Sequence, residues 1–228
     1  MIRALVFDVF GTLVDWRSGV AREAERLIPG VDGGAFADAW RARYQSSMEP
    51  VRSGARPYVD LDVLHAESLP GVVAQFGLAP LPDVAAAELV QAWHRLDAWP
   101  EVPTAVARLA GRHLLAPTSN AHVRLAVDLA RRNRLPFDAI LGGGYSRTYK
   151  PMPAVYRDAV AALGFAPGET LMVAAHSSDL AAAAAEGLST AHIARPREHG
   201  PAGGETAPSV PVTYAASDLA DLADRLAC

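Results

Sequence analysis

Cysteine is almost absent from this sequence, since the one example, Cys228, is the last residue. A disulfide within the chain is therefore impossible, and we expect a reduced, cytoplasmic setting. Long apolar runs are absent too, and none approaches the roughly 18–20 residues that a membrane-spanning helix needs. The apolar start of the chain resembles a secretory signal, but Asp8 interrupts it and no small-residue cleavage site follows. We therefore expect this stretch to be folded protein.

Lysine and asparagine are also scarce. Lys150 is the one lysine among 21 basic residues, and asparagine occurs twice, at Asn120 and Asn133. Arginine presents a planar fork of donors, whereas lysine is a compact and flexible point charge. A lysine that persists in a chain otherwise biased toward arginine indicates a position where arginine does not do the same work. Survival by chance is the alternative for Lys150.

The chain nevertheless has enough apolar material for a sizeable core. Of its 228 residues, 50% are hydrophobic and 20% are charged. This balance excludes intrinsic disorder as the dominant state and favours one large domain, or a domain with a sizeable insert. The net charge of −4 and the scattered basic residues give no sign of a nucleic-acid-binding surface.

Apolar periodicity predicts an α/β fold with a helical insert. Residues 2–7 form a short apolar run that ends in Asp8 and Gly11-Thr12, as expected for a buried strand followed by a turn. From Trp16 to His94 the periodicity is helical throughout, and it predicts helices at residues 17–27, 34–48, 61–76 and 82–94. Beyond residue 100 two kinds of pattern alternate. Strands are expected at residues 113–116, 137–141, 170–174, 190–194 and 212–214, and helices at 102–109, 121–132, 153–163, 179–186 and 217–226.

This alternation predicts a parallel, doubly wound sheet. We therefore expect a core domain formed by residues 1–15 and 98–228, and a helical cap domain formed by residues 16–97. The cap is expected over the carboxyl edge of the sheet, because active sites lie at that edge in such folds.

Four polar segments are expected at this edge: Asp8, Thr118-Ser119-Asn120, Lys150 and Asp179. A carboxylate at the end of an apolar strand can act as a nucleophile that forms a covalent ester. An ammonium group can orient that carboxylate, and hydroxyl and amide groups can donate hydrogen bonds to an anionic substrate or leaving group. The constellation favours an active site with Asp8 as the nucleophile, although Asp8 could instead only cap a helix.

The same segments resemble the four motifs of the haloacid dehalogenase superfamily. The stretch Asp8-Val-Phe-Gly-Thr-Leu-Val-Asp15 is similar to the first motif, and Thr118-Ser-Asn120 is similar to the second. Tyr149-Lys150-Pro151 is similar to the third, and Val173-Ala-Ala-His-Ser-Ser-Asp179 is similar to the fourth. The motifs occur in order and the resemblance covers the whole chain. It implies a Rossmann-like parallel sheet core with an inserted helical-bundle cap domain.

The residue two positions after Asp8 narrows the resemblance. Phosphatases of the superfamily carry a second aspartate there as general acid/base, whereas Phe10 cannot transfer a proton. The sequence is therefore most similar to the type II L-2-haloacid dehalogenases, which have an aromatic residue at this position and need no metal ion or other cofactor. The stretch Trp40-Arg41-Ala-Arg-Tyr44 resembles their cap helix with its arginine, and Tyr156 matches another family position. The resemblance also suggests a homodimer, with a small haloacid as substrate and no nucleic-acid or membrane partner.

The resemblance implies a mechanism of two steps. Asp8 attacks the α-carbon of a short (S)-2-haloacid opposite the halogen, and water then hydrolyses the ester to an (R)-2-hydroxyacid. The implied roles are halide binding by Arg41 and Asn120, carboxylate binding by Ser119, an apolar lining by Phe10 and Tyr44, positioning of Asp8 by Thr12 and Lys150, support of the polar network by Tyr156, and positioning of Lys150 and activation of water by Asp179.

Two residues depart from the family pattern. Ala174 stands where the family often has a serine, and His176 stands where it often has an asparagine. Ala174 lacks the hydroxyl that would bond the nucleophile. We expect His176 to line the site, either as a hydrogen-bond donor in place of the asparagine or as the base that activates water. A purely structural histidine is the alternative.

Other functions remain open at this point. A magnesium-dependent phosphohydrolase could hold its ion with Asp8, Asp179 and the carbonyl of Phe10. A hydrolase of another small 2-substituted acid would use the same nucleophile, and a catalytically weak relative could bind a small acid or a protein partner. Structural roles are also open for Arg41 as a solvated helix residue, for Tyr156 in core packing and for Asp179 as an N-cap.

Overall fold

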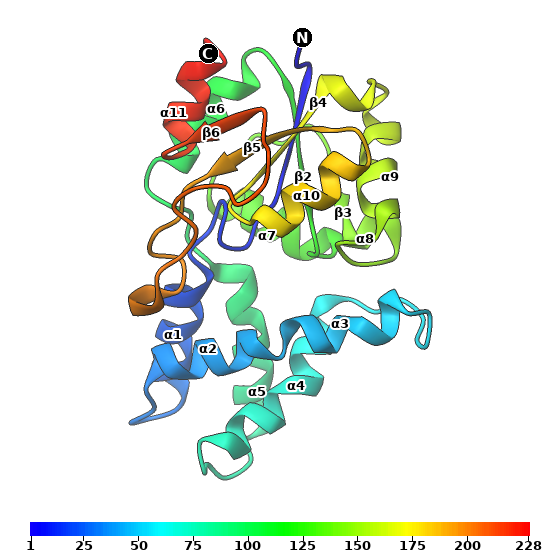
Figure 1. The fold of residues 1–228 in the computed structure, drawn as a ribbon. Helices are drawn as coiled ribbons and strands as arrows, with labels where there is room; N and C mark the ends of the chain where they lie inside the picture. The colour runs from blue at the N-terminus through cyan, green and yellow to red at the C-terminus, as the bar shows by residue number, and fades with distance from the viewer.

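A six-stranded parallel sheet and a group of helices form the two ends of the molecule (Figure 1). The structure is a computed structural model and describes residues 1–228. The strand order is β3-β2-β1-β4-β5-β6, and each neighbouring pair is parallel, which confirms the predicted Rossmann-like sheet. The strands are β1 (Ala4–Phe7), β2 (Leu114–Ser119), β3 (Leu141–Gly142), β4 (Thr170–Ala174), β5 (Ser189–Ile193) and β6 (Tyr214–Ala216).

The central strands are mostly apolar because helices cover both faces of the sheet. Every residue of β1 and of β4 is buried, as is usual in parallel sheets. On one face Leu5 and Phe7 pack with α6 (Val102–Ala110), α7 (Val123–Arg132) and α11 (Leu219–Arg225). On the other face Val6 and Met172 pack with α9 (Pro153–Leu163) and α10 (Ser177–Ala185).

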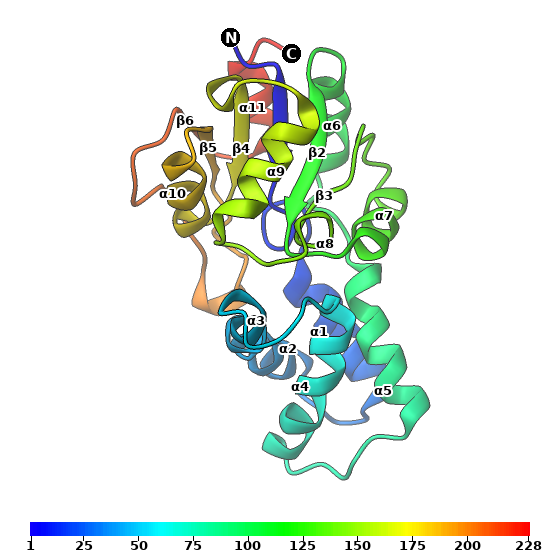
Figure 2. The same cartoon turned by 90° about the vertical axis from the view of Figure 1, so that its right-hand side faces the viewer.

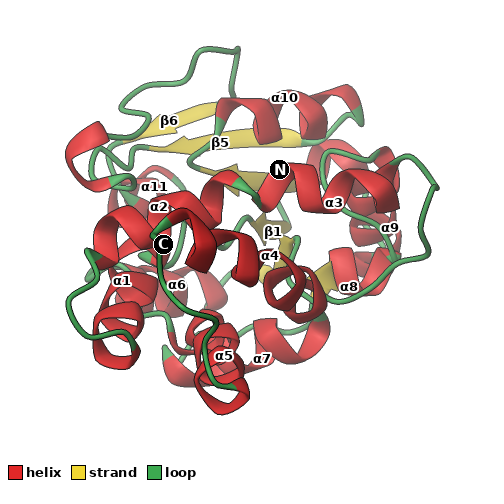
Figure 3. Cartoon of the chain, turned by 90° about the horizontal axis from the view of Figure 1, so that it is seen from below, coloured by secondary structure: helices red, strands yellow, loops and turns green.

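The helical insert lies beyond the edge at which the strands end (Figures 1 and 2). Figure 3 views the molecule from the side of this insert, with the strands behind it. None of its helices, or of any others here, has the length and apolar character to cross a membrane. The insert comprises α1 (Trp16–Leu27), α2 (Gly33–Ala42), α3 (Tyr44–Arg52), α4 (Leu61–Gln75), α5 (Asp83–Val90) and the 3-10 helix η1 (Gln91–Arg95).

We propose the domain division that the sequence indicates, with a cap of residues 16–97 and a core of residues 1–15 and 98–228. The chain leaves the core at residue 15 and returns at residue 98, and hydrogen bonds join these two segments. The backbone N–H of Asp15 donates to the carbonyl of Asp97 at 2.9 Å, and that of Trp99 donates to the carbonyl of Leu13 at 3.0 Å. The Asp15 carboxylate then accepts a hydrogen bond from the Ser18 N–H, so it caps α1 where the insert begins.

Four of the expected elements are wrong in their extent. The helix expected at residues 82–94 ends at Val90 and is followed by the 3-10 helix η1, and the strand expected at residues 212–214 is β6 at Tyr214–Ala216. The single helix expected at residues 34–48 is two helices, α2 and α3, which meet at Arg43. The strand expected at residues 137–141 pairs with β2 only at Leu141–Gly142. Near its start, the backbone N–H of Asp138 donates to the carbonyl of Leu115, but the backbone N–H of Leu115 donates to the Asp138 side chain instead of its backbone. A ladder of backbone hydrogen bonds therefore does not begin there.

Candidate active site

The carboxyl ends of β1, β2 and β4 meet under the insert and bring charged side chains to one cavity. Its volume is about 470 Å³. Nine residues singled out from the sequence line it, namely Asp8, Phe10, Arg41, Tyr44, Asn120, Lys150, Tyr156, His176 and Asp179. Gln45, Pro151, Ser178 and Glu205 complete the lining. Acidic, basic and aromatic groups thus surround one space between the sheet and the cap.

Asp8 is held from behind by Thr12. The chain turns back after β1 at Gly11, whose φ of +87° lies in the region that favours glycine. This turn lets the Thr12 hydroxyl donate to Asp8 Oδ2 at 2.8 Å, while the same hydroxyl accepts from the Ala175 N–H at 2.9 Å. Thr12 is fully buried and does not line the cavity, so it positions the carboxylate without meeting a ligand.

Lys150 joins the two buried aspartates. Its Nζ lies 3.3 Å from Asp8 Oδ1 and 2.6 Å from Asp179 Oδ2. Tyr156 donates its hydroxyl hydrogen to Asp179 Oδ1 at 2.6 Å, and the Lys150 N–H donates to Asn120 Oδ1 at 2.7 Å. Burial favours neutral lysine, but the charges of Asp179 and Asp8 outweigh it and raise the pKa of Lys150. The ammonium group therefore remains charged at neutral pH.

The pKa values of the two aspartates are shifted in opposite directions. Burial alone raises the pKa of a carboxyl group, and for Asp179 burial prevails over the attraction of Lys150. For Asp8 the positive charge of Lys150 and the hydrogen bond of His176 outweigh burial and hold its pKa well below the usual range. Asp8 is thus the ionised carboxylate that faces the cavity.

His176 bridges Asp8 and a second buried acid, Glu198. Its Nδ1 lies 3.3 Å from Asp8 Oδ2, and its Nε2 lies 2.9 Å from Glu198 Oε1. The Trp16 indole N–H also donates to Glu198 Oε1, at 3.1 Å, and Glu198 is only 1% exposed. Burial lowers the pKa of His176, but its hydrogen bonds to Asp8 and Glu198 prevail and raise it to about 10. With both ring nitrogens donating, His176 is an imidazolium in this arrangement.

Sequence reasoning missed Glu198, as it missed the lining residues Gln45, Pro151, Ser178 and Glu205. Glu198 lies in the Gly- and Pro-rich stretch 195–208, which reads as a loop, and it is separated by 22 residues from His176 and by 182 from Trp16. No local spacing therefore connects it with its partners. The one available signal was an acidic residue beside His199 in a loop, which is common on protein surfaces.

The cap contributes an arginine that is framed by aromatic rings. The guanidinium carbon of Arg41, on α2, lies 4.0 Å from the ring centre of Tyr44 and 5.2 Å from that of Trp16. Its Nη1 is buried and makes no hydrogen bond within the protein. The ring of Phe10 meets Tyr44 and Trp93 edge to face. A donor without a partner in an apolar surround is a place for a small anion.

Ser119 lies beside this cavity but does not line it. Its side chain is buried, and its Oγ accepts a hydrogen bond from the Ala121 N–H at 3.0 Å. This bond shapes the turn that presents Asn120 to the cavity. Ser119 is thus the one expected binding residue that does not line the cavity.

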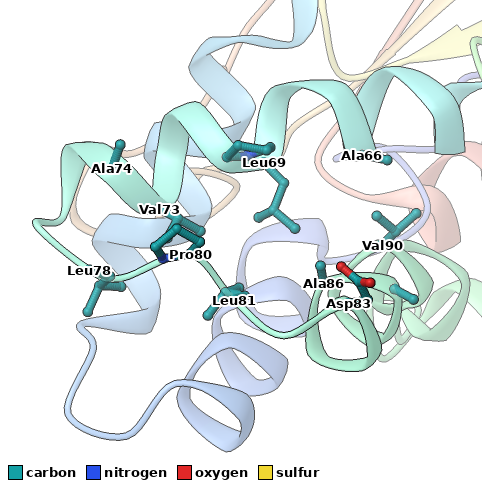
Figure 4. Close-up of a pocket in the computed structure, with 12 residues that line it drawn as sticks. Ala66, Leu69, Val73, Ala74, Leu78, Pro80, Leu81, Asp83, Ala86 and Val90 are labelled. Carbon is teal, nitrogen blue, oxygen red and sulfur yellow. The ribbon is translucent and has the colours of Figure 1, made fainter.

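A second cavity of about 490 Å³ lies between α4 and α5, away from this chemistry (Figure 4). Its lining includes Leu69, Val73, Leu81 and Val90, and Asp83 is its one charged residue. It offers neither a nucleophile nor a cation, so an anionic substrate finds no partner there.

The fold and the buried Asp8–Lys150–Asp179 group define a class of hydrolases. A family model described as haloacid dehalogenase-like hydrolase matches residues 2–187, and the chain belongs to this family. Its relatives are more specific. An (S)-2-haloacid dehalogenase of Xanthobacter autotrophicus is 32% identical over 196 residues, which are 86% of this chain and 76% of that protein. One from Pseudomonas sp. strain CBS-3 is 31% identical over 197 residues, or 85% of each chain.

Solved structures give the same result. The crystal structure of the defluorinating L-2-haloacid dehalogenase Rha0230 is 42% identical, with a TM-score of 0.95 and coverage of 100% of this chain and 96% of that one. The Xanthobacter autotrophicus enzyme with chloropropionic acid covalently bound is 28% identical, with a TM-score of 0.84 and coverage of 100% and 99%. The resemblance stated from the four motifs is confirmed.

Proposed function

We propose that this protein is a hydrolytic dehalogenase that converts short (S)-2-haloacids into (R)-2-hydroxyacids through an ester on Asp8. The observation that carries this proposal is an ionised aspartate facing an aromatic-framed arginine, with Phe10 where a proton donor would stand. Relatives named (S)-2-haloacid dehalogenases support it, as does a solved relative that carries covalently bound chloropropionic acid.

In the first step Asp8 forms the ester. Its carboxylate is already ionised at neutral pH, so it needs positioning more than activation, and Thr12, Lys150 and His176 supply the positioning. One carboxylate oxygen forms a bond to the α-carbon while the carbon–halogen bond breaks on the opposite side. The halide leaves with the bonding electron pair, and the configuration at the α-carbon inverts.

The departing halide and the substrate carboxylate need separate partners. We assign the halide to Arg41, whose Nη1 has no other partner, and to the amide of Asn120. The Oδ1 of Asn120 is engaged by the Lys150 N–H, which leaves the NH₂ group to donate. Phe10 and Tyr44 give this end an apolar lining. We assign the substrate carboxylate to backbone N–H groups near Ser119, whose own side chain lies behind the cavity wall and shapes the turn of Asn120.

In the second step water attacks the carbonyl carbon of the Asp8 ester. Ester formation removes the negative charge of Asp8, one of the two charges that hold the proton on His176, so the pKa of His176 falls. After that proton is lost to solvent, Nδ1 faces the ester and accepts the proton of the attacking water. Glu198 keeps the ring oriented, and Asp179 keeps Lys150 in place. The bond between the Asp8 carbonyl carbon and the ester oxygen then breaks, and the hydroxyacid leaves with the proton that His176 returns. The second proton of the water passes from the Asp8 carboxyl group to His176, which restores the carboxylate and the imidazolium.

The test is halide release from both enantiomers of 2-chloropropionate, with EDTA and with Mg²⁺, beside a generic phosphate ester. We expect release from the (S)-enantiomer alone, with (R)-lactate as product and equal rates with EDTA and Mg²⁺. Phosphate release that requires Mg²⁺, without halide release, would overturn the proposal.

The magnesium-dependent phosphohydrolase is not favoured, because Phe10 is packed against Tyr44 and Trp93 and has no proton to give. The change Phe10→Asp places a carboxyl group there. We expect a Mg²⁺-dependent phosphatase activity to appear while halide release falls by about tenfold or more, since an apolar wall becomes charged. Phe10→Leu is the matched control and should leave both phosphatase activity absent and most halide release in place. No change of either activity in Phe10→Asp would contradict the assignment of Phe10.

We propose an enzyme that needs no cofactor, acts as a homodimer and works in the cytoplasm, as the family resemblance and the single cysteine suggest. Light scattering during gel filtration measures the assembly, and a mass equal to one chain would contradict the dimer. Activity after prolonged dialysis against EDTA tests the cofactor, and fractionation of the source cells tests the location.

A further inference from the structure

A cluster of histidines and aspartates joins the cap to the core outside the active site. Asp62 lies in the first turn of α4 and His94 lies in η1, both in the insert. His122 is the N-cap residue of α7, and Asp128 lies within α7, both in the core. None of these four residues lines the cavity of Asp8. The proposed reaction therefore leaves the cluster without a role.

Two of the distances within the cluster are close to those of a metal site. His94 Nε2 lies 3.0 Å from each oxygen of Asp62, and His122 Nε2 lies 3.6 Å from Asp62 Oδ2. The three ligand atoms all lie within 4.8 Å of one another. Tetrahedral Zn²⁺ with bonds of about 2.0–2.1 Å places neighbouring ligand atoms roughly 3.3 Å apart. The His94–Asp62 separation of 3.0 Å is slightly shorter than that value, and the His122–Asp62 separation of 3.6 Å is slightly longer.

The surroundings of His94 also fit a metal, and His122 has a ring without hydrogen bonds. His94 Nδ1 lies 2.8 Å from Asp128 Oδ2, the carboxylate–histidine contact that orients metal-binding imidazoles. The His122 side chain is only 7% exposed, and its Nδ1 is buried without a hydrogen-bond partner. Its Nε2 faces Asp62 from beyond hydrogen-bond distance. A buried imidazole with no hydrogen bond, facing a carboxylate, is unusual unless something binds between them.

We propose that Asp62, His94 and His122 bind one divalent transition ion of the Zn²⁺, Co²⁺ or Ni²⁺ type. Two imidazoles and one carboxylate suit these ions. The Asp62 side chain is 27% exposed, so an ion can enter there and keep water as a further ligand. With ligands from α4, η1 and α7, the ion ties the cap to the core. One of its ligands, His122, lies two residues after Asn120. The ion takes no part in the chemistry at Asp8.

The test uses the full-length protein without an affinity tag, stripped of metals and titrated with ZnCl₂ alone. We expect one Zn²⁺ per chain by equilibrium dialysis, and Co²⁺ in its place should give the visible absorption of a tetrahedral site. His122→Asn removes a ligand and should abolish both signals. Asp128→Asn removes only the orienting contact and should weaken binding by about 10–100-fold. Zn²⁺ should raise the Tm of the natural protein but not that of His122→Asn.

His113→Asn is the matched control, because it makes the same change at a histidine outside the cluster, whose Nε2 lies 3.5 Å from Cys228 Sγ. It should bind Zn²⁺ as the natural protein does. Circular dichroism checks that each variant is folded. Binding that survives in His122→Asn, binding lost in His113→Asn, or no stoichiometric binding by the natural protein would overturn the proposal.

Discussion

Side chains of alternating charge run along one line of contacts in the cavity. Glu198 contacts His176, His176 contacts Asp8, Asp8 contacts Lys150, and Lys150 contacts Asp179. Each buried charge thus has a neighbour of opposite sign, which offsets much of the cost of its burial. Because the groups are coupled, the change of charge at Asp8 on ester formation alters the affinity of His176 for its proton.

Asp8→Asn should abolish halide release, with a loss of about 1,000-fold or more, because a neutral amide is a poor nucleophile. Initial rates with (S)-2-chloropropionate measure the loss. Asp15→Asn is the matched control, since it makes the same change seven positions further along the chain, at an N-cap where asparagine is equally suitable. It should retain near-normal rates. An Asp8→Asn variant of comparable activity would remove Asp8 as the nucleophile.

His176→Asn should change how stability depends on pH. The pKa of His176 is raised from 6.5 to about 10 in the folded protein, so the stability that its charge contributes is complete below pH 6.5. That contribution is lost as the pH rises from about 6.5 through about 10. The difference in free energy of unfolding between the natural protein and the variant should therefore shrink over this range. Urea unfolding at pH 6, 8 and 10 measures it, and a constant difference would refute the raised pKa.

At the scale of elements, a loop completes a site that the strands begin. The strand ends supply Asp8, Asn120 and the start of α10, but Glu198 comes from the connection between β5 and β6. Its carboxylate fills the space beside Gly11, where a Cβ would lie 2.1 Å from Glu198 Oε1. The glycine therefore serves both the turn after β1 and the approach of this loop.

Glu198→Gln should separate positioning from chemistry. The glutamine keeps a hydrogen bond to His176 but loses the charge that raises the pKa of its imidazolium, so that pKa should fall. We expect kcat to fall by about tenfold or more because the imidazole becomes a weaker base, KM to change little, and the acid limb of the pH profile of kcat to move to lower pH. Glu205→Gln is the matched control, because Glu205 lies in the same loop and bonds Ser177 instead. An unshifted pH profile in Glu198→Gln would contradict this role.

At the scale of the whole molecule, the cap and the core close on the cavity through a few polar contacts. Arg52 Nη1, on α3, donates to the carbonyl of Lys150 at 3.1 Å, and the Tyr149 hydroxyl donates to the carbonyl of Val59 at 2.5 Å. Both contacts join α3 or the segment after it to the loop that carries Lys150. Cap position and lysine position are therefore connected.

Arg52→Ala should loosen this connection. Arg52 also bonds Gln45 and Glu49, but those contacts stay within α3, and only the bond to Lys150 reaches the core. Loss of that one bond costs about 1 kcal/mol, which corresponds to about a fivefold change in affinity. We expect KM for the haloacid to rise by about that factor, with a smaller effect on kcat, in steady-state halide release. Arg56→Ala is the control, since Arg56 pairs with Glu67 entirely within the cap. Equal effects of the two substitutions would indicate a general loss of cap stability instead.

The parallel sheet, the helical insert and most of the residues around the cavity could be predicted from the sequence. Continuous apolar runs and helical periodicity are local properties, and Asp8, Asn120, Lys150 and Asp179 each follow from their place in a motif. Local periodicity could not locate the break between α2 and α3, because both helices continue one apolar pattern.

Contacts between residues that are distant in the sequence depend on the folded chain and could not be predicted. Glu198 reaches His176 and Trp16 because a loop between β5 and β6 folds over the first turn of the chain. Asp62, His94 and His122 meet because the insert returns to the core beside α7. The charge of His176 depends on two carboxylates that are neighbours in space and not in sequence, so its raised pKa is a property of the fold.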